Sequence, residues 1–106
     1  MRPAARQSLE NPENLVFFSA GAAWELELKA AKGKVALPKG WLEAAGETGF
    51  RELPVTAEDA AASARLPWHH NDPFDRLFIA KAARRGWSLA TRDAFSPRYA
   101  VRVLTV

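Results

Sequence analysis

Three acidic residues occupy positions in the chain that could form a catalytic site. Glu25 lies in the second turn of a predicted helix, Asp75 lies in the first turn of a later one, and Asp93 directly follows a predicted strand. In an open α/β sheet such positions converge beyond the carboxyl ends of the strands. Converging carboxylates repel one another unless a divalent cation, typically Mg²⁺ or Mn²⁺, neutralises them. Because such a cation can activate water against a phosphodiester, the pattern predicts a metal-dependent nuclease.

Each of these acids also has a purely structural interpretation. Asp75 stands three residues after the predicted helix N-cap, Asp72, and can cap the helix without any metal. Glu25 can pair with Lys29 one helical turn later, and Asp93 can cap a short turn. These alternatives stay open for each residue taken singly. The occurrence of all three acids at convergent positions favours the cation site.

Short apolar runs and helix-forming segments alternate along the chain and must position these acids. The runs that predict strands are residues 14–18, 50–53, 87–90 and 101–106. The segments that predict helices are residues 20–32, 40–47, 56–66 and 73–85. Thr56 is a predicted N-cap with Asp59 at the third helical position, which is close to a capping box, and Asp72 with Pro73 begins the last helix. This order predicts an α/β fold with a mostly parallel sheet covered by helices.

Composition limits the function classes that remain. A length of 106 residues, 48% hydrophobic and 25% charged, predicts one globular domain over residues 1–106. The chain has no Cys, which excludes a disulfide framework and a zinc ribbon. No apolar run is long enough to span a bilayer and the start does not read as a secretory leader, so we expect a cytoplasmic protein without a membrane partner. The net charge of +3 permits binding to nucleic acid without requiring it.

Basic and imidazole side chains near the acids are candidates for RNA contacts. Arg76 and Arg92 each neighbour one of the acids, and His70 lies in the loop before the last predicted helix. All three could meet RNA phosphates. A zinc site at the adjacent His pair is disfavoured because no Cys or third His completes a ligand set. Arg84-Arg85 could likewise hold the RNA backbone, but a solvated helix end with favourable dipole contacts is the favoured interpretation of this pair.

Five segments carry a family resemblance when they are taken together. They include Trp-Glu at 24–25, Asp-Pro-Phe-Asp-Arg at 72–76 and Thr-Arg-Asp at 91–93, which are specific in combination. The full segments are residues 19–25, 32–38, 49–56, 69–77 and 91–93. In this order and at this spacing they resemble PIN-domain proteins, and most of all the VapC-like toxins of type II toxin–antitoxin pairs. The resemblance extends from about Arg2 to Val106.

The resemblance implies a fold, an activity and partners. The fold would be a three-layer α/β/α arrangement with a mostly parallel sheet. The activity would be Mg²⁺- or Mn²⁺-dependent endonucleolytic cleavage of structured RNA such as transfer RNA, inhibited by a cognate antitoxin, in a chain that forms homodimers. By position, Glu25, Asp75 and Asp93 match the second, third and fourth acids of the family's metal site, and Asp72 matches a recurrent residue beside it.

The chain departs from the family pattern at its start. Family members open with an apolar strand that ends in Asp, whereas here no Asp precedes Asp59. The resemblance thus implies that the central strand and the first acid are missing, which would weaken the cation site. Strands at 15–18 and 87–90 would then present unpaired apolar edges. A second hypothesis follows, in which the chain is a non-catalytic remnant that binds an antitoxin or a PIN homologue through these edges.

Overall fold

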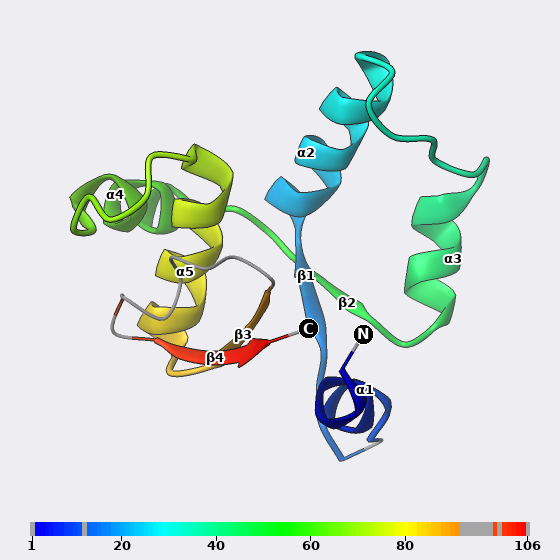
Figure 1. Cartoon of the computed structure of the whole chain (residues 1–106), viewed down its shortest axis with the longest axis horizontal. Coiled ribbons are helices and arrows are strands. Elements are labelled where there is room, and N and C mark those ends of the chain that lie inside the picture. The colour runs from blue at the N-terminus through cyan, green and yellow to red at the C-terminus, as the bar shows by residue number, and fades with distance from the viewer. Residues whose placement is uncertain (1, 12, 92–98, 100, 106) are drawn as a thin grey trace. The chain divides into compact units, whose positions relative to one another are not determined.

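The computed structural model describes residues 2–11, 13–91, 99 and 101–105. Helices and parallel strands alternate along the chain (Figure 1), which confirms the predicted α/β class. Each predicted helix and strand is present, although β1 begins three residues later than expected. The elements are α1 (Pro3–Glu10), β1 (Phe17–Ser19), α2 (Ala20–Ala31), α3 (Trp41–Glu47), β2 (Arg51–Leu53), α4 (Ala57–Arg65), α5 (Pro73–Arg85), β3 (Ser88–Thr91) and β4 (Arg102–Thr105).

The chain divides into two compact units, one formed by residues 15–55 and the other by residues 1–14 together with 56–106. In the first unit β1 and β2 pair in parallel, with Phe17 opposite Arg51 and Ser19 opposite Leu53. Ser19 ends β1 and is also the N-cap of α2, because its hydroxyl oxygen accepts a hydrogen bond from the Gly21 N–H at 3.0 Å. The strand therefore passes directly into the helix that carries Glu25.

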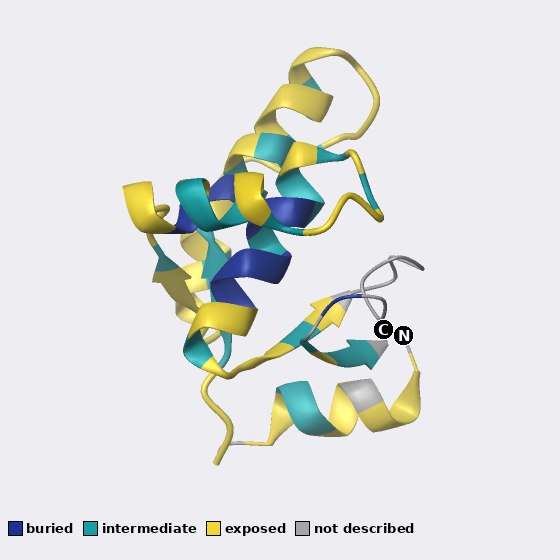
Figure 2. Ribbon diagram, turned by 90° about the vertical axis from the view of Figure 1, so that its left-hand side faces the viewer, coloured by how far each residue is buried: buried dark blue, intermediate teal, exposed yellow. Residues whose placement is uncertain are grey.

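The second unit is built around α5. Figure 2 shows a run of buried positions along this helix, and its buried apolar residues are Leu77, Ile79, Ala80 and Ala82. Helix α4 packs against α5, and β3 follows α5 and pairs in parallel with β4, with Ser88 opposite Arg102. Within the described residues the parallel strands form two pairs, not one continuous sheet.

Local signals set both ends of α5. The Asp72 side chain accepts hydrogen bonds from the N–H groups of Phe74 at 2.8 Å and Asp75 at 3.2 Å, and Pro73 occupies the first turn. Gly86 ends the helix in the left-handed region, with φ at +68°. These are the ends that the sequence predicts for this helix.

Helix α1 is the one described element that was not predicted from the sequence. It carries no side-chain cap at its N-terminus, and polar residues follow its basic start. Arg6 and Glu10 form an exposed ion pair on this helix, at 3.8 Å. None of the helices in the described ranges is long and apolar enough to cross a membrane.

Candidate functional site

Asp75 meets an imidazole at the start of α5. His70 Nε2 lies 2.9 Å from Asp75 Oδ2, and the two side chains are 17% and 29% exposed. The Asp72 N–H, which a capping box would direct to the carboxylate of Asp75, instead donates to His70 Nδ1 at 3.0 Å. The cap on this helix comes from the Asp72 side chain. The carboxylate of Asp75 is thereby turned toward the loop that precedes the helix.

Arg76, the next residue, organises that loop from inside. Its side chain is 3% exposed, and its guanidinium carbon lies 3.6 Å from the ring centroid of Trp68. The guanidinium donates to backbone carbonyls at distances of 2.7–3.1 Å, those of Ser63, Leu66, Pro67 and His70. These bonds give Arg76 a structural role in place of the expected RNA contact, because a buried guanidinium occupied by carbonyls has little left to offer a phosphate.

The backbone of His70 is held on both sides. Its N–H donates to the Tyr99 hydroxyl at 2.9 Å, and its carbonyl accepts from Arg76 Nη1 at 3.1 Å. The same Arg76 nitrogen donates to the Tyr99 hydroxyl at 3.4 Å, and Tyr99 is itself buried. The imidazole that contacts Asp75 is therefore carried by a fixed segment of backbone.

Glu25 lies on α2 in the unit formed by residues 15–55. Its carboxylate pairs with Lys29 Nζ at 3.3 Å, one helical turn later, as the structural interpretation expects. The side chain of Glu25 is half-buried, while that of Lys29 is largely exposed. The pair does not exclude a cation at Glu25, because a surface ion pair of this kind contributes only about 0.3–0.5 kcal/mol.

Asp93 and Arg92 lie outside the described residues, so their predicted roles stay predictions. Among the residues that are described, no group of three or more His, Asp or Glu side chains is gathered that could hold a metal ion. The chemistry of the donors does fit such an ion. Glu25 and Asp75 offer carboxylate oxygens that keep some exposure, and hard cations such as Mg²⁺ and Mn²⁺ prefer oxygen ligands of this type.

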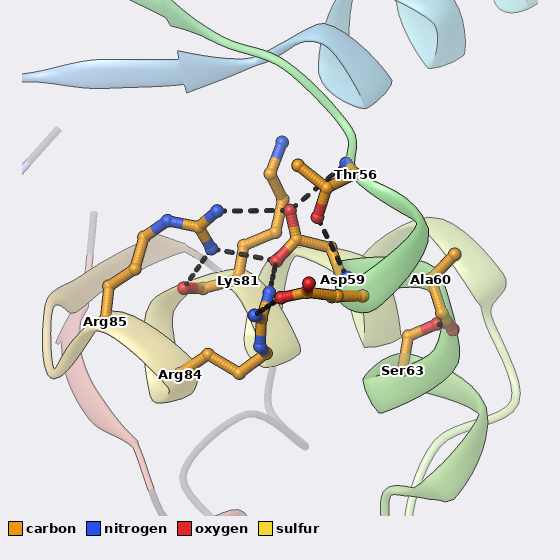
Figure 3. A network of polar contacts seen from close by, with 8 residues as sticks. Thr56, Asp59, Ala60, Ser63, Lys81, Arg84 and Arg85 are labelled. Atoms are coloured by element: carbon orange, nitrogen blue, oxygen red, sulfur yellow. Dashed lines mark hydrogen bonds and ion pairs between the residues drawn. The ribbon is translucent and has the colours of Figure 1, made fainter.

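A second cluster of charge, not foreseen from the sequence, joins α4 to α5 (Figure 3). Asp59 is fully buried, and its carboxylate accepts from Arg84 at 2.5 Å and from Arg85 at 2.9 and 3.2 Å. Arg84 also donates to Glu58 at 2.7 Å. The interpretation of Arg84-Arg85 as a solvated helix end holds only in part, because Arg84 is exposed but both side chains turn back to a carboxylate on the neighbouring helix.

The charges of this cluster shift one another's proton affinity. The hydrogen bond from Arg85 lowers the pKa of Asp59 well below its ordinary value, against the effect of burial, and the bonds from Thr56 and Arg84 lower it further. The same bond with Asp59 raises the pKa of Arg85. Burial lowers the pKa of Lys81, which lies beside them on α5. Asp59 thus stays ionised in the folded protein.

Thr56 and Asp59 also form the predicted capping box. The Asp59 N–H donates to Thr56 Oγ1 at 3.1 Å, and the Thr56 N–H donates to Asp59 Oδ2 at 3.3 Å. The sequence predicts this cap, whereas the arginine contacts depend on how α4 packs on α5. The cluster supports the helix that carries Asp75 and contributes no predicted ligand of its own.

Comparison with known proteins gives one family. The family model described as PIN domain matches residues 2–101. The match spans Glu25, Asp75 and Asp93, and it runs through both compact units. Searches of curated proteins and of solved structures find no match.

Proposed function

The chain belongs to the PIN domain family, and we propose that it is a VapC-like toxin that cleaves RNA with the help of a divalent cation. Proteins of this family are generally nucleases that act on RNA or DNA and typically depend on divalent metal ions. The observation that carries the proposal is the family match across the three acids. A single PIN-like domain over residues 1–106 is part of the same proposal.

Glu25, Asp75 and Asp93 are the residues that would hold Mg²⁺ or Mn²⁺ in this proposal. When bound, the cation supplies a means of activating water and of stabilising the charge that develops on the phosphodiester. Asp72 contributes indirectly, since its cap fixes the first turn of α5 and therefore the backbone that carries Asp75. The role of Glu25 requires its carboxylate to exchange Lys29 for the cation, which the weakness of an ion pair to a solvent-exposed lysine allows.

RNA is the proposed substrate, with transfer RNA as the class to test first. Arg92 remains a proposed phosphate contact, while Arg76 does not, because its guanidinium is buried and bonded to carbonyls. A cognate antitoxin and a second copy of the chain are the proposed protein partners, and the cytoplasm is the proposed location. These finer assignments follow the resemblance to VapC-like toxins.

The proposal is tested by incubating the folded chain with mixed transfer RNA, with and without Mn²⁺. We expect metal-dependent cleavage that EDTA stops and that Glu25→Gln and Asp75→Asn each abolish. Glu27→Gln is the matched control on α2, because its amide oxygen can still accept the 2.9 Å hydrogen bond from Trp41 Nε1. Cleavage that survives either acid substitution, or none by a folded protein, contradicts the enzyme proposal.

A second candidate function is partner binding without catalysis. What favours it is that the described parallel strands form two separate pairs, while parallel strands usually belong to larger sheets covered on both faces. A strand from a partner could extend such a pair. Binding of a cognate antitoxin in size-exclusion chromatography, together with no Mn²⁺-dependent cleavage, would favour this function over the first.

A further inference from the structure

The contact between His70 and Asp75 assigns a role to a residue outside the proposed ligand set. We propose that His70 is a positioning residue, which fixes the orientation of the Asp75 carboxylate for cation binding. The inference rests on the proposed function, because it takes Asp75 as a ligand. It is carried by the 2.9 Å separation of His70 Nε2 and Asp75 Oδ2.

The hydrogen bonds around the ring define which nitrogen carries the proton. His70 Nδ1 accepts from the Asp72 N–H at 3.0 Å, so this nitrogen presents a lone pair. In the neutral ring the proton is therefore on Nε2, the nitrogen that lies 2.9 Å from Asp75 Oδ2. One imidazole thus links the N-cap of α5 to the carboxylate in the first turn of the same helix.

The imidazole can hold the carboxylate because its own backbone is held. The Tyr99 hydroxyl accepts the His70 N–H, and the buried Arg76 donates to the His70 carbonyl. With both ring nitrogens and both backbone groups engaged, His70 is poorly placed to bind a phosphate. We therefore assign it to Asp75 and not to the RNA contact predicted from the sequence.

Partners that orient a metal ligand matter nearly as much as the ligand. Removing such a partner typically lowers metal affinity or activity by roughly 10–100-fold, because the ligand then samples unproductive orientations. A carboxylate at the start of a helix has side-chain torsions that the helix alone does not fix. The imidazole restricts these torsions before the cation arrives.

Two amide substitutions distinguish the contact of His70 Nε2 with Asp75 from the contact of His70 Nδ1 with Asp72. His70→Gln places an amide N–H donor near the position of Nε2 and keeps the bond to Asp75. His70→Asn places an amide oxygen near Nδ1, keeps the bond to Asp72 and removes the imidazole N–H that faces Asp75. His69→Asn is the matched control, since this neighbour is exposed and its ring stands edge-on to that of Tyr99, with 5.1 Å between the ring centroids.

Titration calorimetry with Mn²⁺ on the full chain measures the effect, and circular dichroism checks that each variant is folded. We expect His70→Asn to bind Mn²⁺ roughly 10–100-fold more weakly than the unaltered chain. His70→Gln and His69→Asn should both bind close to normally. Asp75→Asn should lose binding to at least the same extent as His70→Asn.

Nitrogen NMR of the imidazole rings gives a second readout that needs no metal. The chain has two His residues, so His69→Asn leaves only the signals of His70. We expect the Nε2–H form, with a proton signal that moves upfield in Asp75→Asn. A proton on Nδ1 in the neutral ring overturns the inference.

The binding data distinguish failure of the inference from failure of the proposed function. If Asp75→Asn loses Mn²⁺ binding while His70→Asn does not, or if His70→Gln is as impaired as His70→Asn, only the positioning role is overturned. If the unaltered chain binds no Mn²⁺, or Asp75→Asn binds it normally, the proposed function fails at Asp75 and the inference falls with it.

Discussion

Asp59→Asn removes the negative charge at the centre of the cluster between α4 and α5 while keeping the size of the side chain. Asp59 is 0% exposed and is bonded to two guanidinium groups. Removing one partner of a buried ion pair typically costs 3–5 kcal/mol, because the remaining charge is left without its counterpart. Arg84 and Arg85 are 34% and 21% exposed, so water recovers part of their solvation. We therefore expect Asp59→Asn to lower the free energy of unfolding by about 3 kcal/mol, the lower end of this range.

The neighbouring acid provides a matched control. Glu58→Gln also removes one negative charge, and Glu58 also pairs with Arg84, at 2.7 Å. The Glu58 side chain is 81% exposed, however, and exposed pairs contribute only about 0–1 kcal/mol. The two substitutions differ by one position in the chain and share Arg84 as a partner, so the difference between them reports the burial of Asp59 together with its bonds to Arg85 and Thr56.

Urea unfolding of the three proteins measures the difference. The midpoint should fall markedly for Asp59→Asn and little for Glu58→Gln, with the slope m unchanged in both. An m value that changes would mean that the unfolded or native ensemble has changed instead. If Asp59→Asn costs no more than Glu58→Gln, the buried carboxylate is not the element that holds α4 against α5, and the reasoning is refuted.

Three further outcomes are expected from the same structure. The pKa of Asp59 is lowered in the folded state, so the ionised carboxylate stabilises the fold at pH values above its unfolded pKa of about 3.9. This stabilisation is lost as the pH falls below that value. Acid unfolding followed by circular dichroism should therefore show a larger loss of stability for the unaltered chain than for Asp59→Asn. Gly86→Ala should lower the free energy of unfolding by about 1–2 kcal/mol in thermal unfolding, because φ is +68° at this residue. Gly46 lies inside α3 with open space around it, so Gly46→Ala should raise the free energy of unfolding by about 0.5–1 kcal/mol. Changes of the same sign in the two variants would contradict this reasoning. In Arg76→Lys the shorter set of donors cannot reach all of the carbonyls that Arg76 binds, so amide hydrogen exchange in residues 66–70 should accelerate. Unchanged protection would show that the loop is stable without these hydrogen bonds.

Features that depend on a few adjacent residues were predicted well. The Asp72-Pro73 start and the Gly86 end of α5, and the capping box of Thr56 with Asp59, are local patterns that the structure confirms. Their physical basis is the unsatisfied backbone of a helix terminus, which each pattern completes without help from distant residues. Such features can be identified in any single sequence.

Features that depend on packing between helices were not predicted. The same carboxylate of Asp59 that completes the cap also binds Arg84 and Arg85, about 25 residues away, and no spacing rule connects them. Arg76 has the sequence context of an exposed basic residue beside an acid, and only the loop folded around it shows why it is buried. At the candidate site, the contact between His70 and Asp75 is local in sequence but depends on the conformation of the loop before α5, while the place of Asp93 stays a prediction.

The compact unit that carries Asp75 is discontinuous in the chain, since residues 1–14 belong with residues 56–106. During synthesis α1 is therefore made before an intervening segment of about 40 residues that separates it in sequence from the rest of its unit. Its unit cannot assemble in the order of translation, and joining its two parts requires closing a loop whose entropic cost grows only slowly with length. By contrast α4 and α5 are neighbours in sequence and can dock early. Folding of this unit should accordingly begin with the packing of α4 on α5 and finish with α1.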